Sequence, residues 1–214
     1  MAGVIALLGH ACASKVAAGR ARSLLKGAVP WLLGQESETK DGFPFYAGPG
    51  VSHKRAFAGW CHGDPGIAMA LLAAARGAGE PAWEQEALAI ARRAARLSPK
   101  EAGVRDAGLC HGAAGLGHLF HRMSRATGDP ILRQASEKWF ARSLASRRDG
   151  GIAGFSAWGT GADGSMGWLA SPGFQMGAAG IALSLLAACA EHEPGWDRLL
   201  LVSGPRVASE VEHP

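Results

Sequence analysis

A short glycine pattern recurs before the most apolar segments of the chain and constrains the fold more than any other sequence feature. Three copies are complete and one lacks its front half: Gly63-Asp-Pro-Gly66-Ile, Gly112-Ala-Ala-Gly115-Leu, Gly177-Ala-Ala-Gly180-Ile and Gly3-Val-Ile. The marker glycines are 63, 49 and 65 residues apart (3 to 66, 66 to 115, 115 to 180). Recurrence at this spacing is typical of proteins built from repeated helical units.

Each interval between markers contains an apolar helix, a more amphipathic helix and a return loop. Hydrophobic periodicity predicts apolar helices over 3–17, 64–77, 113–126 and 178–190, and amphipathic helices over 23–33, 81–97 and 131–147. Pro30 is expected to break or bend its helix, and the Asp-Pro pairs at 64–65 and 129–130 are expected to begin helices with an Asp cap. Residues 149–174 read as a long glycine-rich loop.

These elements predict an all-α fold in which the apolar helices form an inner layer and the amphipathic helices an outer layer. Glycines at the inner helix N-termini would let the backbones crowd toward a common centre. The alternative is a set of ordinary helical hairpins that do not belong to a ring.

Composition excludes several classes of protein. The 214 residues are 48% hydrophobic and 19% charged, which is not the balance of a disordered chain. The 22 basic residues are mixed with 18 acidic ones for a net charge of +4, so no nucleic-acid partner is expected. No apolar run is long enough for a transmembrane helix, and the first residues do not make a signal peptide, so a cytoplasmic protein is expected.

Two of the four cysteines stand directly before predicted inner helices. Cys61 lies in Gly59-Trp-Cys-His-Gly63, and Cys110 lies in Gly108-Leu-Cys-His-Gly112. If the inner helix N-termini converge, Cys61, Cys110 and His111 meet as two thiolates and an imidazole, a set that binds Zn²⁺ and leaves a fourth position open. The alternative is two buried cysteines beside two surface histidines. Cys12 and Cys189 are predicted to be small buried residues of alanine-rich helices.

These motifs resemble those of the lanthionine synthetase C-like (LanC) cyclases. Residues 59–67 and 107–116 resemble the two zinc motifs of that family, and the resemblance continues through Thr127-Gly-Asp-Pro, Pro172-Gly-Phe and Trp196-Asp-Arg. The resemblance implies an α/α toroid with two layers of seven helices, of which this chain would hold about four inner ones. It also implies that a Zn²⁺ ion held by Cys61, Cys110 and His111 activates a peptide thiol for addition to dehydroalanine or dehydrobutyrine.

The chain departs from the family pattern at several positions. It has no counterpart of an essential family His in a His-Gly-x-x-Gly motif or of an upstream Asp, and Phe57 stands where the family has Arg. His62 follows the first ligand and is a candidate proton donor, with local hydrogen bonding or solvent exposure as the alternative. We expect residues 1–203 to form the C-terminal half of such a domain, truncated and weak or inactive alone, followed by a polar tail at 204–214.

Three functions are therefore compared. A zinc-dependent cyclase half would act on a dehydrated precursor peptide, with a dehydratase or the missing N-terminal half as further partners. A non-catalytic zinc-binding module would bind a peptide or protein without reaction. A glycosidase on a helical toroid would need paired carboxylates, and Asp64, Asp106 and Asp163 give no convincing pair.

Overall fold

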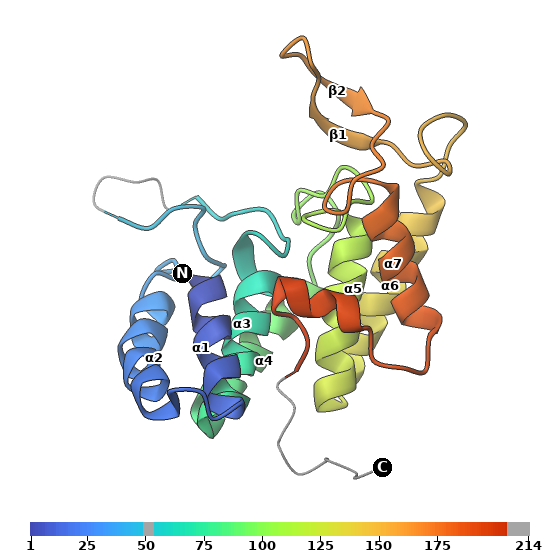
Figure 1. Cartoon of the computed structure of the whole chain (residues 1–214). Coiled ribbons are helices and arrows are strands. Elements are labelled where there is room, and N and C mark those ends of the chain that lie inside the picture. Colours follow the sequence, from blue (N-terminus) through green and yellow to red (C-terminus); the bar gives the residue numbers. More distant parts are fainter. Residues whose placement is uncertain (49–53, 205–214) are drawn as a thin grey trace.

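The protein is described by a computed structural model over residues 1–48 and 54–204, and the elements are helical apart from one small hairpin (Figure 1). The elements are α1 (Ala2–Ala13), α2 (Ala18–Leu33), α3 (Gly63–Ala78), α4 (Pro81–Ala95), α5 (Ala113–Thr127), α6 (Pro130–Ala145), β1 (Ala157–Thr160), β2 (Met166–Leu169), α7 (Ala178–Cys189) and the short 3₁₀ helix η1 (Gly195–Leu200). The all-α prediction is confirmed.

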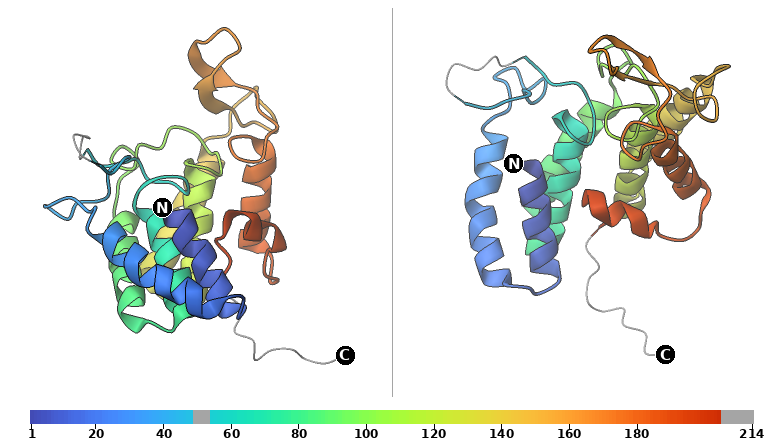
Figure 2. Two further views of the ribbon diagram at one scale, coloured as in Figure 1. Left: turned by 60° about the vertical axis from the view of Figure 1, so that its left-hand side comes forward. Right: turned by 45° about the horizontal axis from the view of Figure 1, so that its top comes forward.

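The helices form two layers that follow the alternation expected from the sequence. In the inner layer α1 packs on α3, α3 on α5 and α5 on α7, and in the outer layer α2, α4 and α6 cover α1, α3 and α5. Figure 2 shows the row from two further directions. The inner α3 is buried along most of its length, whereas α4 and α6 bury one face only. The inner and outer layers of a partial α/α toroid, with four inner helices, are therefore present.

The marker glycines are required because the inner helices begin against a carbonyl of the loop before them. A Cβ atom at Gly66, Gly115 or Gly180 would lie well within 3.0 Å of the carbonyl oxygen six residues earlier, in Trp60, Leu109 and Phe174 respectively. Gly3, the marker of the partial copy, has no such neighbour within 4 Å. The recurrent glycine thus has one structural cause in all three complete copies.

Two local predictions are wrong because tertiary contacts outweigh the local signal, and a third is confirmed. Helix α2 continues through Pro30 to Leu33 although the Pro30 nitrogen cannot donate a helical hydrogen bond, since Val29 and Leu32 on either side of it are buried in the core. Asp64 does not cap α3; its carboxylate is buried and accepts hydrogen bonds from the Phe43 amide (3.1 Å) and Arg93 Nε (2.9 Å). Asp129 does cap α6 as predicted, accepting from the amide of Ile131 (2.8 Å).

The other differences lie near the C-terminal end. Part of the predicted loop at 149–174 forms the antiparallel pair β1–β2, in which Trp158 lies opposite Trp168. Cys12 is buried as predicted, but Cys189 is exposed because it ends α7 on a side that no described element covers. Of the predicted tail at 204–214, all but Gly204 lies outside the described residues, so the domain boundary stays a prediction.

The segment around η1 closes the core across the inner helices. Trp60 Nε1 donates to the carbonyl of Leu200 (2.9 Å), and the His118 ring stacks on Trp196 at 4.7 Å between centroids. His118 Nε2 lies 3.1 Å from the buried carboxylate of Asp197, a partner 79 residues away that no sequence motif indicated. Within the described part of the chain, no helix is long and apolar enough to cross a membrane.

Candidate metal centre

The two cysteine-bearing loops meet at the N-terminal ends of the inner helices. Cys61 precedes α3 and Cys110-His111 precedes α5, with His62 and Gly112 as the N-cap residues. The Trp60 amide donates to the Cys110 carbonyl (2.8 Å), and the Cys110 amide donates to the carbonyl of Gln175, in the loop before α7 (2.8 Å). Three successive repeats are thereby joined by backbone hydrogen bonds at the point where the cysteines lie.

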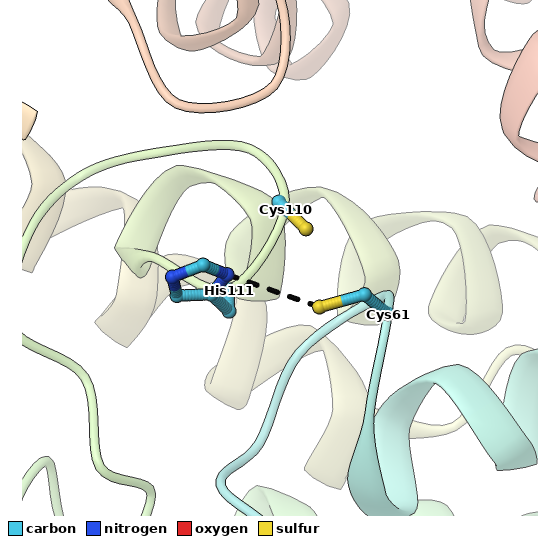
Figure 3. A group of neighbouring side chains, drawn as sticks. All are labelled: Cys61, Cys110 and His111. Carbon is cyan, nitrogen blue, oxygen red and sulfur yellow. Dashed lines mark hydrogen bonds between the residues drawn. The ribbon is translucent and has the colours of Figure 1, made fainter. Parts of the chain in front are cut away.

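The ligand atoms of Cys61, Cys110 and His111 converge as the sequence predicted. One sulfur or ring-nitrogen atom from each lies within 4.8 Å of the other two, and Cys61 Sγ is 3.8 Å from His111 Nδ1 (Figure 3). Zn–S bonds of about 2.3 Å and Zn–N bonds of about 2.0 Å in a tetrahedron separate such atoms by roughly 3.5–3.8 Å. The spacing and the two-sulfur, one-nitrogen donor set therefore fit a zinc ion. Cys61 is exposed, while Cys110 and His111 are half-buried.

The pKa values of the two thiols shift in opposite directions, which favours a thiolate at Cys61. A hydrogen bond from Cys110, helped by His111 and His62, lowers the pKa of Cys61 to about 4. The same thiolate raises the pKa of Cys110 and, by accepting a hydrogen bond from the ring, raises the pKa of His111. Both loops also lead into helix N-termini, whose positive dipole end favours negative charge. The site is thus electrostatically suited to bind a cation through sulfur.

His62 lies at the same place and touches the first ligand. Its Nδ1 is 3.1 Å from Cys61 Sγ, and the side chain is half-buried. The rings of Phe45 and Phe57 lie 5.1 Å and 5.3 Å from the His62 ring, centroid to centroid. The aromatic wall holds the imidazole beside the sulfur, which places His62 within the site rather than on an unrelated surface.

Position 57 contributes an aromatic ring to the site and no positively charged side chain. The Phe57 ring contacts His111 at 5.0 Å between centroids, so an apolar group occupies this wall. Arg55, the neighbouring basic residue, turns away and donates to the carbonyls of Asp41 (3.3 Å) and Glu101 (2.6 Å). The guanidinium is thus used to hold loops together.

Asp106 is a supporting residue that sequence reasoning missed. Its buried carboxylate accepts from the amides of Gly108 (2.9 Å) and Trp158 (2.8 Å), so it fixes the loop before Cys110 and ties it to strand β1. The only available signal was its position four residues before the cysteine, which does not indicate a partner 52 residues later. The carboxylates of Asp64 and Asp106 both accept from backbone amides, so each holds a loop in place.

The chain is a partial α/α toroid. It carries a Cys₂His cluster at the N-termini of its inner helices. Among solved structures, the chain is similar to nisin cyclase, with a TM-score of 0.72 at 19% sequence identity, over 94% of this chain and 48% of that one. The likeness shows the fold, and the chain spans about half the length of that structure. The model of the family described as "Lanthionine synthetase C-like protein" matches residues 1–201, so the chain belongs to this family.

Proposed function

We propose that this chain is the zinc-binding part of a lanthipeptide cyclase, which adds a peptide Cys thiol to dehydroalanine or dehydrobutyrine. The observation that carries the proposal is the convergence of Cys61, Cys110 and His111 from two loops 49 residues apart in a member of this family. In the reaction the sulfur bonds to the β-carbon, the carbon–carbon π bond breaks, and a proton is delivered to the α-carbon. Thiol and alkene combine without a leaving group.

The site residues would have two roles, which are to bind the metal and to transfer a proton. Cys61, Cys110 and His111 would hold the zinc ion, which when bound lowers the pKa of a coordinated thiol. His62, 3.1 Å from Cys61 Sγ, is proposed as the group that hands a proton to the substrate. The hydrogen bonds that Asp106 accepts would keep the second ligand loop in place while substrate enters.

We propose that the chain alone reacts slowly. The family's essential His and Asp have no counterpart among its residues, and Phe57 replaces the family Arg. Loss of one general acid or base commonly costs on the order of 10² to 10⁴ in rate. The proposed partners are a dehydrated precursor peptide and a protein segment that supplies the remaining inner helices, with a dehydratase as a further candidate.

A second candidate, a zinc-containing module that binds a peptide or protein without reaction, is favoured by one observation. Phe45, Phe57 and His62 line the site with rings, and the Phe57 ring also contacts His111. A surface of that kind can bind a thiol-bearing peptide while lacking groups that stabilise the enolate.

Metal analysis and a cyclisation assay separate these functions. The purified chain should carry about one zinc, Cys110→Ala should lose it, and Cys189→Ala, at the exposed end of α7, should retain it. Ring formation in a dehydrated precursor peptide is then followed by thiol alkylation and mass spectrometry. Zinc retained by the double variant Cys61→Ala/Cys110→Ala would refute the metal site. Zinc-dependent peptide binding without ring formation would favour the second candidate.

A further inference from the structure

A cavity of about 270 Å³ opens beside Cys61, and the loop that carries His111 is not among its walls. Its walls come from the start of α1, the end of α2, residues 43–47 of the following loop and the turn that begins α3. The N-terminal end of α1 lies next to this loop in Figure 1. Because Cys61 and His62 are themselves part of the wall, the cavity and the metal centre are continuous.

The wall is rich in aromatic rings. Its aromatic members are Trp31, Phe43, Phe45, Tyr46 and Trp60. Among the residues that the structure describes, no Asp, Glu, Lys or Arg side chain lines it. Two polar groups of the wall are engaged elsewhere: Gln35 Nε2 donates to the Trp31 carbonyl (3.0 Å) and Trp60 Nε1 to the Leu200 carbonyl. Away from Cys61 and His62, a carboxylate or ammonium group entering this space would lose its hydration and meet no Asp, Glu, Lys or Arg side chain.

The size and position of the cavity limit what it can hold. Ligand pockets for drug-sized molecules are about 300–1,000 Å³, so a space of about 270 Å³ suits one large side chain rather than a folded segment. A residue of an extended chain spans at most ~3.3–3.6 Å. A peptide whose thiol reaches the metal centre at Cys61 therefore brings the side chain of an adjacent residue to the mouth of the cavity.

We propose that this cavity binds one aromatic or large aliphatic side chain of the peptide, carried by a residue next to the reacting cysteine. The inference rests on the proposed function, and it names the substrate class: peptides in which the cysteine has a large apolar neighbour. Edge-to-face contacts of the kind already present between Phe45 and Phe57 (4.7 Å, 74°) favour an aromatic occupant. The metal centre would hold the sulfur, and the cavity would select the sequence around it.

The test uses peptides that cannot react. Two heptapeptides differ only in the residues that flank a central Ser, both Phe in one and both Asn in the other. Binding to the metal-free chain is measured by tryptophan fluorescence, because Trp31 and Trp60 line the cavity. We expect the Phe peptide to bind at least about tenfold more tightly, as burial of a large apolar side chain implies. Trp31→Ala should weaken it about fivefold, while Leu24→Ala, a similarly exposed position of α2 outside the wall, should not.

Equal affinity for the two peptides, or equal effects of Trp31→Ala and Leu24→Ala, would overturn the inference. The matching Cys peptides, tested with the zinc-loaded chain and an added dehydroalanine acceptor, separate it from the proposed function. Thioether formation at the same kcat/KM for both peptides would refute the proposed side-chain selection by the cavity and would support the proposed cyclase function. If the chain prefers the Phe peptide but retains no zinc, the proposed side-chain selection by the cavity is supported and the proposed cyclase function is refuted.

Discussion

The marker glycine Gly115 offers the most direct test of how the repeats place the metal ligands. It lies in the first turn of α5, buried against the carbonyl of Leu109, the residue before Cys110. The neighbouring atoms of Leu109 are backbone atoms, so no side chain can rotate away from an added methyl group. Gly115→Ala therefore forces the helix and the ligand loop apart.

The expected cost follows from two opposing effects. Alanine in a helix gains roughly 0.5–1 kcal/mol over glycine. Overpacking a rigid contact costs about 1–3 kcal/mol, and a Cβ well inside 3.0 Å of backbone on a buried turn belongs at the upper end. We expect a net loss of about 2 kcal/mol in the free energy of unfolding. Displacement of the Cys110 backbone, which bonds to Trp60 and Gln175, should also weaken zinc binding about tenfold or more.

The assay compares Gly115→Ala with the same substitution at a glycine whose Cβ position has no neighbouring atoms. Gly27 lies inside α2 with nothing within 4 Å of its Cβ position, so Gly27→Ala should stabilise the chain by about 0.5–1 kcal/mol. Urea unfolding followed by circular dichroism gives both stabilities, and competition with a chromophoric chelator gives zinc affinity. A Gly115→Ala chain as stable as the original, with unchanged zinc affinity, would refute the packing argument.

Two further predictions concern the groups around the ligands. Asp106→Asn leaves one backbone amide without an acceptor, so we expect a loss of about 1–3 kcal/mol in urea unfolding and faster zinc release, with the exposed Asp163→Asn as control. Because the pKa of Cys61 is lowered to about 4, its alkylation by iodoacetamide in metal-free protein should stay nearly constant from pH 8 to 5 and decline only near pH 4. An ordinary peptide thiol slows about tenfold per pH unit below ~8.5. The same slope for Cys61 would contradict the lowered pKa of this thiol.

The sequence by itself determined the helices, their layers and the candidate ligands. Apolar periodicity is a local property, and it indicated which helices lie inside and which outside. The marker glycines indicated backbone contacts at inner helix N-termini, and Cys61 and Cys110-His111 stand beside them in two copies. Equivalent positions of stacked repeats lie close together in space. The repetition of the motif therefore predicted that the two cysteine-bearing loops meet.

Only the tertiary structure decided which distant groups support the site. The carboxylate of Asp106 accepts a hydrogen bond from an amide 52 residues away. The carboxylate of Asp64, which was expected to cap α3, instead accepts from the Phe43 amide and from Arg93. The cavity beside Cys61 is made by α1, α2, residues 43–47 and the turn that begins α3, and no sequence motif indicated it. Hydrogen bonds and cavities of this kind depend on which segments fold against one another, and a buried carboxylate binds whichever donors the fold brings to it.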